Sequence, residues 1–219
     1  MEEFSPLIVS LKTSFCATVI TFFLGIMIAW KIRTINEKIK SIIDSVITLP
    51  MVLTQTVLGI FLLIIFGKKG IFGKWLYSIG VSVVFSWWAT VIAAIVVAFP
   101  LMYRSAKGAF EQIDSNIINA AKTMGVSDFK IFWKVTVPLA WPGIAAGTML
   151  TFARALGEFG ATLMIAGNIP GKTQTIPIAI YFASEGGEME KAYLWVAVVF
   201  IISLSVMLVM NMTSLNKRR

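Results

Sequence analysis

Residues 119–138 open with Asn119-Ala-Ala-Lys-Thr-Met-Gly125 and, after nine further residues, close with Val135-Thr-Val-Pro138. This stretch is polar, and a long apolar run lies on each side of it. A polar segment between two apolar runs is typical of a loop that joins two membrane-spanning helices.

The same stretch contains its own helix signals. Asp114 or Ser115 is suited to N-cap a short helix through the two alanines, and Gly125 supplies the left-handed residue that ends it. Ser127 with Asp128 favours the start of a second helix. The small alanines leave one face without bulk, so the groove of another protein could close over it. The alternative is an ordinary cytoplasmic helix-turn-helix loop.

The composition indicates that the lipid bilayer is the solvent of this chain. Its 219 residues are 58% hydrophobic, which is too apolar for a soluble domain of this length. Five runs reach the roughly 18 to 20 residues that a helix needs to cross hydrocarbon. They cover residues 13–30, 45–66, 75–103, 135–153 with a continuation to about 171, and 192–216. We therefore predict one all-α integral membrane domain over residues 1–219, with about five transmembrane helices and no period-two pattern of a barrel.

The distribution of positive charge predicts the orientation. Of the 19 Lys and Arg residues, four lie in 31–44, five in 104–134 and three at the C-terminus, against five on the opposite side. By the positive-inside rule, the C-terminus and the loop at about 104–138 are cytoplasmic, whereas the N-terminus and the loop at about 167–191 are outside. This topology accounts for the net charge of +8, and no motif for nucleic acid accompanies it.

Asn119-Ala120-Ala121, Gly125 and Val137-Pro138 resemble the EAA loop of ABC importer permeases, the coupling helix that sits in a cleft of the ATPase subunit. The first position in that family is usually Glu, and Asn119 departs from it. The resemblance implies that the following residues couple this chain to an ATPase: Asn119, Ala120, Ala121, Gly125 and Pro138.

A second resemblance covers Arg154-Ala-Leu-Gly-Glu158-Phe-Gly-Ala-Thr162 and the run from Gly167-Asn-Ile-Pro-Gly to Pro177-Ile-Ala-Ile-Tyr181. Both stretches are similar to the molybdate permease (ModB-like) family, to which sulfate and thiosulfate permeases are close. With Leu49-Pro50 and Thr56-Val-Leu-Gly59, the likeness extends over most of the chain.

The resemblance implies a type I ABC importer permease in the plasma membrane that moves molybdate, with tungstate as a companion, into the cytoplasm. It implies a homodimer, two cytoplasmic ABC ATPase subunits that bind ATP and Mg²⁺, and an extracytoplasmic oxyanion-binding protein. This subunit would hold no cofactor, metal or catalytic residue of its own. The alternatives are a sulfate or thiosulfate permease subunit, which pairs with a non-identical partner, and an oxyanion transporter that needs no ATP.

Arg154 and Glu158 are the ionisable residues deep inside a predicted span. Four residues apart, they share one helix face and can pair, which lowers the cost of each charge in the bilayer. In a structural interpretation the pair holds the helix in place. In a functional one Arg154 faces a water-filled path and attracts an oxyanion, while Glu158 keeps it from becoming a trap.

The other polar residues of the spans could accompany an anion without holding it, although Ser and Thr also mediate helix packing. The candidates for the translocation path are Thr48, Thr54, Gln55, Thr56, Ser86, Thr90 and Thr151. The glycines of the fourth run permit close approach of another helix and suggest a dimer interface there. These are Gly143, Gly147, Gly157 and Gly160.

Ala166-Gly-Asn-Ile-Pro-Gly-Lys172-Thr173 fits a relaxed phosphate-loop pattern. A working phosphate loop needs a buried strand before it and a helix after it, whereas an apolar membrane run precedes this one and Pro177 follows closely. The chain has no histidine and one cysteine, Cys16, which disfavours zinc or copper chemistry and an enzymatic site.

Overall fold

The computed structural model describes residues 4–215, and all regular structure in that range is helical. Lys217, Arg218 and Arg219, which entered the charge count, lie outside the described residues. The helices are α1 (Ser5–Lys31), α2 (Glu37–Val52), α3 (Gln55–Phe66), α4 (Ile71–Ser78), α5 (Trp87–Glu111), α6 (Ser115–Thr123), α7 (Asp128–Ile131), α8 (Val137–Leu156), α9 (Gly160–Ala166), α10 (Ile176–Glu185) and α11 (Met189–Leu215). A π-helical turn (Phe132–Thr136) joins α7 to α8.

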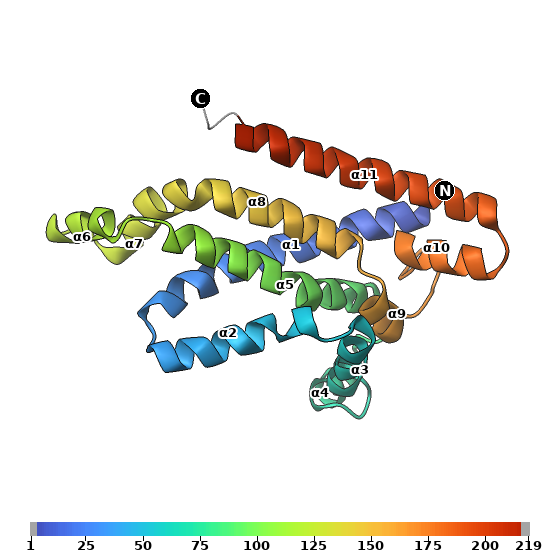
Figure 1. The fold of residues 1–219 in the computed structure, drawn as a ribbon. Helices are drawn as coiled ribbons and strands as arrows, with labels where there is room; N and C mark the ends of the chain where they lie inside the picture. The colour runs from blue at the N-terminus through green and yellow to red at the C-terminus, as the bar shows by residue number, and fades with distance from the viewer. Residues whose placement is uncertain (1–3, 216–219) are drawn as a thin grey trace.

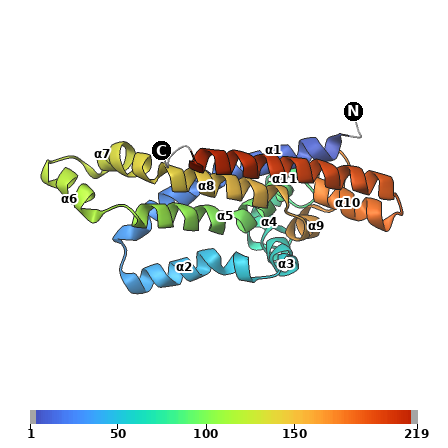
Figure 2. The ribbon, with the colours of Figure 1, turned by 45° about the horizontal axis from the view of Figure 1, so that its top comes forward.

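Helices α1, α5 and α8 pack side by side in the centre of the molecule (Figure 1). They approach closely where small side chains meet, since Ala17, Ala98 and Ala155 are all buried in one cluster. A larger core around Phe110 and Ile144 lies toward α6. Helices α6 and α7 project beyond one end of this bundle, whereas α9 and α10 lie at the other end (Figure 2). The polar connection between α5 and α8 is therefore presented at one end of the molecule.

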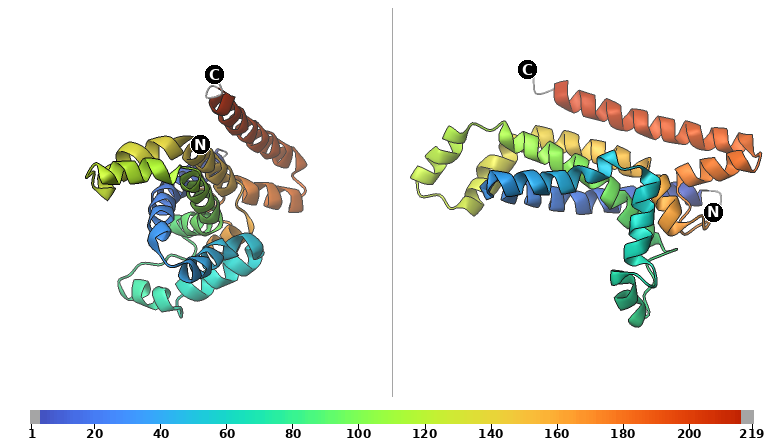
Figure 3. Two further views of the ribbon diagram at one scale, coloured as in Figure 1. Left: turned by 60° about the vertical axis from the view of Figure 1, so that its left-hand side comes forward. Right: turned by 60° about the horizontal axis from the view of Figure 1, so that its bottom comes forward.

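Four of the described helices are long and apolar enough to cross a bilayer, and the bent pair α2 and α3 makes a fifth if it counts as one span. This confirms the prediction of an all-α protein with about five transmembrane helices. Helix α11 stands apart from the bundle over much of its length (Figure 3). Its side chains Phe200, Ile201 and Leu204 are exposed, so this surface needs an apolar environment.

The prediction of one helix over residues 45–66 is wrong, because the chain bends by 114° between α2 and α3. Thr54 is extended at the bend, with ψ of 147°. Helix α3 turns crosswise (Figure 3) and packs on α9, where Leu58 shares a core with Ala161. At Gly59 an added Cβ would lie 2.9 Å from the Met164 Cγ. The bend thus depends on tertiary packing, which hydropathy does not report.

The predicted third span began too early. Helix α5 starts at Trp87 rather than at residue 75 and continues past Tyr103 to Glu111. Residue 75 instead belongs to the short helix α4, after which Gly80 has a φ of +79°. The left-handed glycine stops that helix, and the chain has to reverse before α5 can begin.

The fourth predicted span does not continue to residue 171. Helix α8 ends at Leu156, and the separate helix α9 begins at Gly160. The residues between them are not helical, and the Glu158 side chain accepts a hydrogen bond from the backbone N–H of Ala161 at the start of α9. Hydropathy predicts a single helix for an apolar run that contains one acid. Here that acid, Glu158, instead bonds a free N–H at the start of a second helix, α9.

Three of the four glycines singled out in the sequence pack against other helices of the same chain. An added Cβ at Gly143 would lie 2.7 Å from the Cβ of Ala109 on α5, and Gly147 faces Ser105 on the same helix. At Gly160 the neighbour is Gln55 of α3, at 2.8 Å. The close helix contact that the glycines predicted is therefore present within the chain, and the suggested dimer interface along this element stays a prediction.

We expect Gly143→Ala to lower the melting temperature of the purified protein, because the added methyl overpacks the contact between α5 and α8 at a cost of about 1–3 kcal/mol. Gly108→Ala is the matched control, since nothing lies within 4 Å of its added Cβ and alanine favours a helix. Thermal unfolding in detergent measures both variants. Equal melting temperatures would refute the packing role of Gly143.

Candidate functional site

Helix α6 has capped ends, as its sequence predicted. The Asp114 side chain accepts a hydrogen bond from the N–H of Asn116 at 2.9 Å. At the other end Gly125 has a φ of +74°. Its N–H donates to the Lys122 carbonyl at 2.9 Å, and the N–H of Val126 donates to the Ala121 carbonyl at 3.2 Å. These two bonds form a Schellman motif, which fixes how the chain leaves the helix.

Helices α6 and α7 present apolar side chains to their surroundings. Met124 is 80% exposed and Phe129 is 73% exposed. Asn119 and Ala120 are also exposed, whereas Ala121 is half-buried. Large apolar side chains at the tip of a polar connection indicate a surface that another protein covers.

An aromatic cluster fixes the base of this segment to the bundle. The ring of Trp30 on α1 lies 4.9 Å from that of Phe132 and 5.9 Å from that of Phe110 on α5. The Arg33 guanidinium lies 5.0 Å from the Trp30 ring. Phe110 is fully buried, and Phe132 is nearly so. A displacement of the segment therefore reaches α1 and α5 through packed rings.

The segment also continues without a loop into α8. The π-helical turn runs directly into α8, where Pro138 occupies one of the first two positions. Because the helix is continuous here, the missing N–H of Pro138 removes one bond of the helical ladder, and the π-helical turn lies directly before it. Single π-helical turns are frequent at functional sites. Helix α7, the π-helical turn and the helix that carries Arg154 thus form one connected element.

Glu158 organises the turn between α8 and α9. Its side chain is 1% exposed and accepts from Arg154 Nη1 at 3.1 Å through Oε2. Its Oε1 accepts from the N–H of Ala161 at 2.9 Å. From α3, Gln55 Oε1 accepts from the N–H of Gly160 at 3.1 Å. Two N–H groups of α9 that have no partner inside the helix are therefore bonded by side chains from two elements.

The other path candidates fall into two sets. Thr90 and Thr151 are fully buried. The Thr90 hydroxyl lies 2.9 Å from that of Thr13 on α1, and Thr151 donates to the Gly147 carbonyl at 2.7 Å. Ser86 is half-buried and donates to a local backbone carbonyl at 2.5 Å. The Thr90 hydroxyl thus links α5 to α1, whereas those of Ser86 and Thr151 bond backbone carbonyls of their own segments.

The second set lies on α2 and at its bend. Thr54, Gln55 and Thr56 are consecutive where α2 meets α3, and the two threonines are exposed. Thr48 is half-buried and donates to the Asp44 carbonyl at 2.8 Å. The structure therefore brings Gln55 next to the Glu158 cap, while Thr48 lies on α2 toward its other end.

The sequence analysis missed a polar cluster between α2 and α5. The Asp44 carboxylate accepts from the Tyr103 hydroxyl and pairs with Lys107. Asp44 was assigned to a loop, whereas α2 already starts at Glu37, behind the Asn36 side chain that accepts from the N–H of Lys38. Recognition of that N-cap would have placed Asp44 on a helix face.

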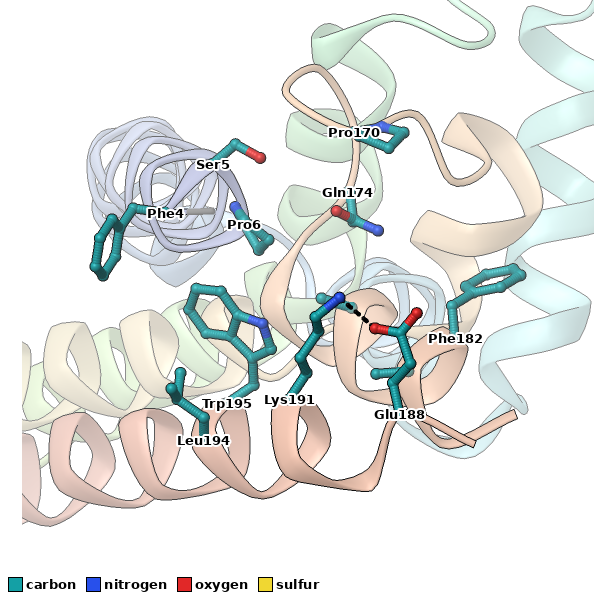
Figure 4. A pocket seen from close by; sticks show the side chains of 12 residues that line it. Phe4, Ser5, Pro6, Pro170, Gln174, Phe182, Glu188, Lys191, Leu194 and Trp195 are labelled. Atoms are coloured by element: carbon teal, nitrogen blue, oxygen red, sulfur yellow. Dashed lines mark ion pairs between the residues drawn. The ribbon is translucent and has the colours of Figure 1, made fainter. Parts of the chain in front are cut away.

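The end opposite α6 carries a cavity of about 450 Å³ between the start of α1, the loop before α10 and the start of α11 (Figure 4). Trp195 and Phe182 line it, and Glu188 forms an ion pair with Lys191 at its edge.

The segment at 166–173, which fits a relaxed phosphate-loop pattern, closes in a turn whose Ile169 N–H donates to the buried Thr173 hydroxyl at 3.0 Å. The end of helix α9 leads into this turn, so its surroundings differ from those of a phosphate loop.

Comparison with known proteins gives consistent matches. The family model described as "Binding-protein-dependent transport system inner membrane component" matches residues 21–219. The permease protein YvgM of Bacillus subtilis (strain 168), named for a molybdenum transport system, is 45% identical over 92% of this chain and 89% of its own length. The molybdenum transport system permease protein ModB of Escherichia coli (strain K12) is 40% identical over 94% of this chain and 91% of its own length.

Two further matches have lower sequence identity to this chain. The protein cysT of Chlorokybus atmophyticus, named for a sulfate transport system permease, is 35% identical over 97% of this chain and 75% of its own length. A crystal structure of a bacterial alginate ABC transporter in complex with an alginate pentasaccharide-bound periplasmic protein contains a chain of similar fold. Its TM-score is 0.72 at 16% identity, over 96% of this chain and 77% of that one.

We expect Glu158→Ala to lower the free energy of unfolding by about 3–5 kcal/mol, because it leaves the Arg154 charge and an N–H of α9 without their partner. Glu158→Gln keeps an acceptor for the cap, so its loss should be smaller. Thermal unfolding in detergent measures both, with Glu185→Ala at an exposed position as the control. If Glu158→Ala melts together with that control, the carboxylate does not hold the turn.

Proposed function

We propose that this chain, which belongs to the family of binding-protein-dependent transport system inner membrane components, is the permease subunit of an ATP-driven importer of molybdate. The observation that carries the proposal is the 40–45% identity, over more than nine tenths of the chain, to permeases of molybdenum transport systems. Tungstate is similar in charge and size and is the expected companion substrate. The protein resides in the plasma membrane and crosses it several times.

The partners follow from the family and from the exposed surface. Two cytoplasmic ABC ATPase subunits bind ATP and Mg²⁺ and receive α6 and α7, whose exposed Met124 and Phe129 supply an apolar contact. An extracytoplasmic binding protein delivers the oxyanion at the opposite end. The excess of Lys and Arg supports placing α6 and α7 in the cytoplasm. In this arrangement hydrolysis belongs to the ATPases, and the chain itself is not an enzyme.

Force passes through contacts already described. When the ATPases close on ATP, α6 and α7 move with them and carry the π-helical turn and α8. The aromatic cluster around Trp30 transmits the same displacement to α1 and α5. At the far end of α8, Arg154 and Glu158 hold α9, and Gln55 ties α9 to α3. A tilt of α8 therefore reorients α9 and α3 at the outer end, which opens or closes the path.

The oxyanion path runs between two copies of the chain, with those candidates that are exposed, Thr54 and Thr56, on its walls. Hydroxyl groups offer weak, exchangeable contacts to an anion, which favours passage over retention. Selection among oxyanions then resides mostly in the binding protein. Gly143 and Gly147 pack on α5 of the same chain, so these two glycines are not needed for a dimer contact.

Two alternatives compete with this proposal. A sulfate permease is the nearest, and its relative is less similar, at 35% identity. A transporter that needs no ATP would not depend on the shape of the α6–α7 connection. The two experiments below separate these possibilities.

We expect Gly125→Val to reduce ATP-driven uptake in proteoliposomes between about 5- and 150-fold, the range of typical coupling free energies. A β-branched residue is strained at a φ of +74°, so the Schellman turn must rearrange. Gly80→Val is the matched control, because its φ is +79° and nothing lies within 4 Å of either added Cβ. Uptake that survives Gly125→Val as well as Gly80→Val would favour the ATP-independent alternative.

The substrate is tested by ATP hydrolysis in liposomes that contain this subunit, its ATPase and its binding protein. Binding protein loaded with molybdate or tungstate should stimulate hydrolysis well above the unloaded protein, whereas sulfate should not. Stimulation by sulfate instead would assign the chain to a sulfate importer. Transport of labelled oxyanion without any ATPase would reject the importer altogether.

A further inference from the structure

Helix α2 is amphipathic, although it belongs to a bent pair of helices that is apolar enough to cross the membrane. One of its faces carries polar residues at helical spacing, namely Glu37, Ser41, Asp44, Ser45 and Thr48. The opposite face is apolar and exposed, with Ile39, Ile42, Val46 and Leu49. In a bilayer the apolar face meets lipid, and the polar face needs water or polar partners. That face is turned toward α5, because Asp44 bonds Tyr103 and Lys107 there.

A groove of about 340 Å³ lies between these two helices, and every residue that lines it has a polar side chain. Helix α5 contributes Arg104 and Lys107, and α2 contributes Lys40 together with its polar face. The groove lies toward the same end of the bundle as α6 and α7 (Figure 1). It has room for a small anion with some of its water.

The charges of the groove are only partly balanced. Lys107 pairs with Asp44, and Lys40 lies 3.5 Å from Glu37 and 3.8 Å from Glu111. Arg104 is exposed, and among residues 4–215 its side chain takes part in none of the ion pairs or side-chain hydrogen bonds. A guanidinium presents two parallel N–H donors, which suits the edge of a tetrahedral oxyanion.

We propose that this groove is a transient binding site for a tetrahedral oxyanion as it leaves the path at the cytoplasmic end, with Arg104 as its main ligand and Lys40 and Lys107 as supporting charges. This inference rests on the proposed function, since it names where the substrate of that function last contacts the protein. Asp44 and Glu37 repel an anion and keep its affinity low. An exit site requires such a balance, because a substrate that is held tightly cannot be released.

The hydroxyls of α2 have a different role in the groove. Ser45 donates to the Ser41 carbonyl at 2.8 Å, and Thr48 donates to the Asp44 carbonyl at 2.8 Å. Because both hydroxyls donate to backbone carbonyls of α2, they have no proton left for the anion. They make the groove polar but do not bind the anion. Attraction therefore comes from the cations, and a change at Arg104 should abolish most of it.

The test uses the reactivity of a single thiol. Cys16 is the sole cysteine of the chain, so Cys16→Ala gives a background in which Ser45→Cys places one thiol at the wall of the groove. The purified permease, in nanodiscs of phosphatidylcholine, is treated with a negatively and a positively charged methanethiosulfonate. We expect the negative reagent to react several-fold faster than the positive one, and molybdate to slow it.

Matched variants isolate the groove. Arg104→Gln should abolish both the charge preference and the protection by molybdate, whereas Lys38→Gln, exposed and outside the groove, should leave both unchanged. Asn116→Cys on α6 reports the reactivity of an exposed thiol elsewhere. Equal rates for the two reagents at Ser45→Cys, or protection that persists in Arg104→Gln, would overturn the proposal.

A phospholipid phosphate shares the chemistry of the substrate, and a second arm separates the two. Nanodiscs that contain phosphatidylglycerol should leave the Ser45→Cys rates unchanged without molybdate, and slowing of the negative reagent there would assign the groove to a lipid headgroup instead. Failure of the transport assay with labelling as expected would reject the importer and leave an anion site. Successful transport without charge preference would reject the groove alone.

Discussion

The Glu158 carboxylate is the interaction on which the arrangement of the helices depends. It joins three elements at once, since it neutralises Arg154 of α8 and caps α9, which in turn packs on α3. A bilayer offers no water to a broken helix, so every N–H freed by a break needs a protein partner. The chain meets this requirement with two side-chain oxygens, one of Glu158 and one of Gln55. Without these caps the turn after α8 would be costly in hydrocarbon.

The need for protein partners in the bilayer also explains how the polar residues are distributed. Some hydroxyls between central helices bond across the helix contact, as Thr13 does with Thr90. The Thr13 hydroxyl also accepts from the Trp87 indole N–H at 3.1 Å. Those on α2 instead line a groove with charged neighbours. A list of polar residues drawn from the sequence therefore mixes two roles. Which role a threonine has depends on whether its helix faces another helix or a gap, and the fold decides that.

The sequence predicts the class of the protein and much of its coupling segment. The capping residues Asp114 and Gly125 act locally, so their geometry follows from neighbours in the chain. Hydropathy locates apolar runs but cannot distinguish a straight span from two helices bent by 114°. The break after Leu156 has the same origin, because the role of Glu158 depends on a helix that follows it. Contacts between distant residues, such as Asp44 with Tyr103, leave no local pattern to read.

Two cations of the helices in the described residues are paired with an acid. Arg154 has Glu158, and Lys107 has Asp44, so these two cations each have an acid beside them. An importer of a dianion needs positive charge to lower the cost of bringing it into a low-dielectric region. It also needs every binding step to be reversible, and a paired cation attracts an anion less than an unpaired one does. Among the described residues Arg104 has no acid within ion-pair distance, and it lines the groove proposed as the exit, where water would screen its charge. Stronger attraction is tolerable there because bulk solvent competes directly for the departing anion.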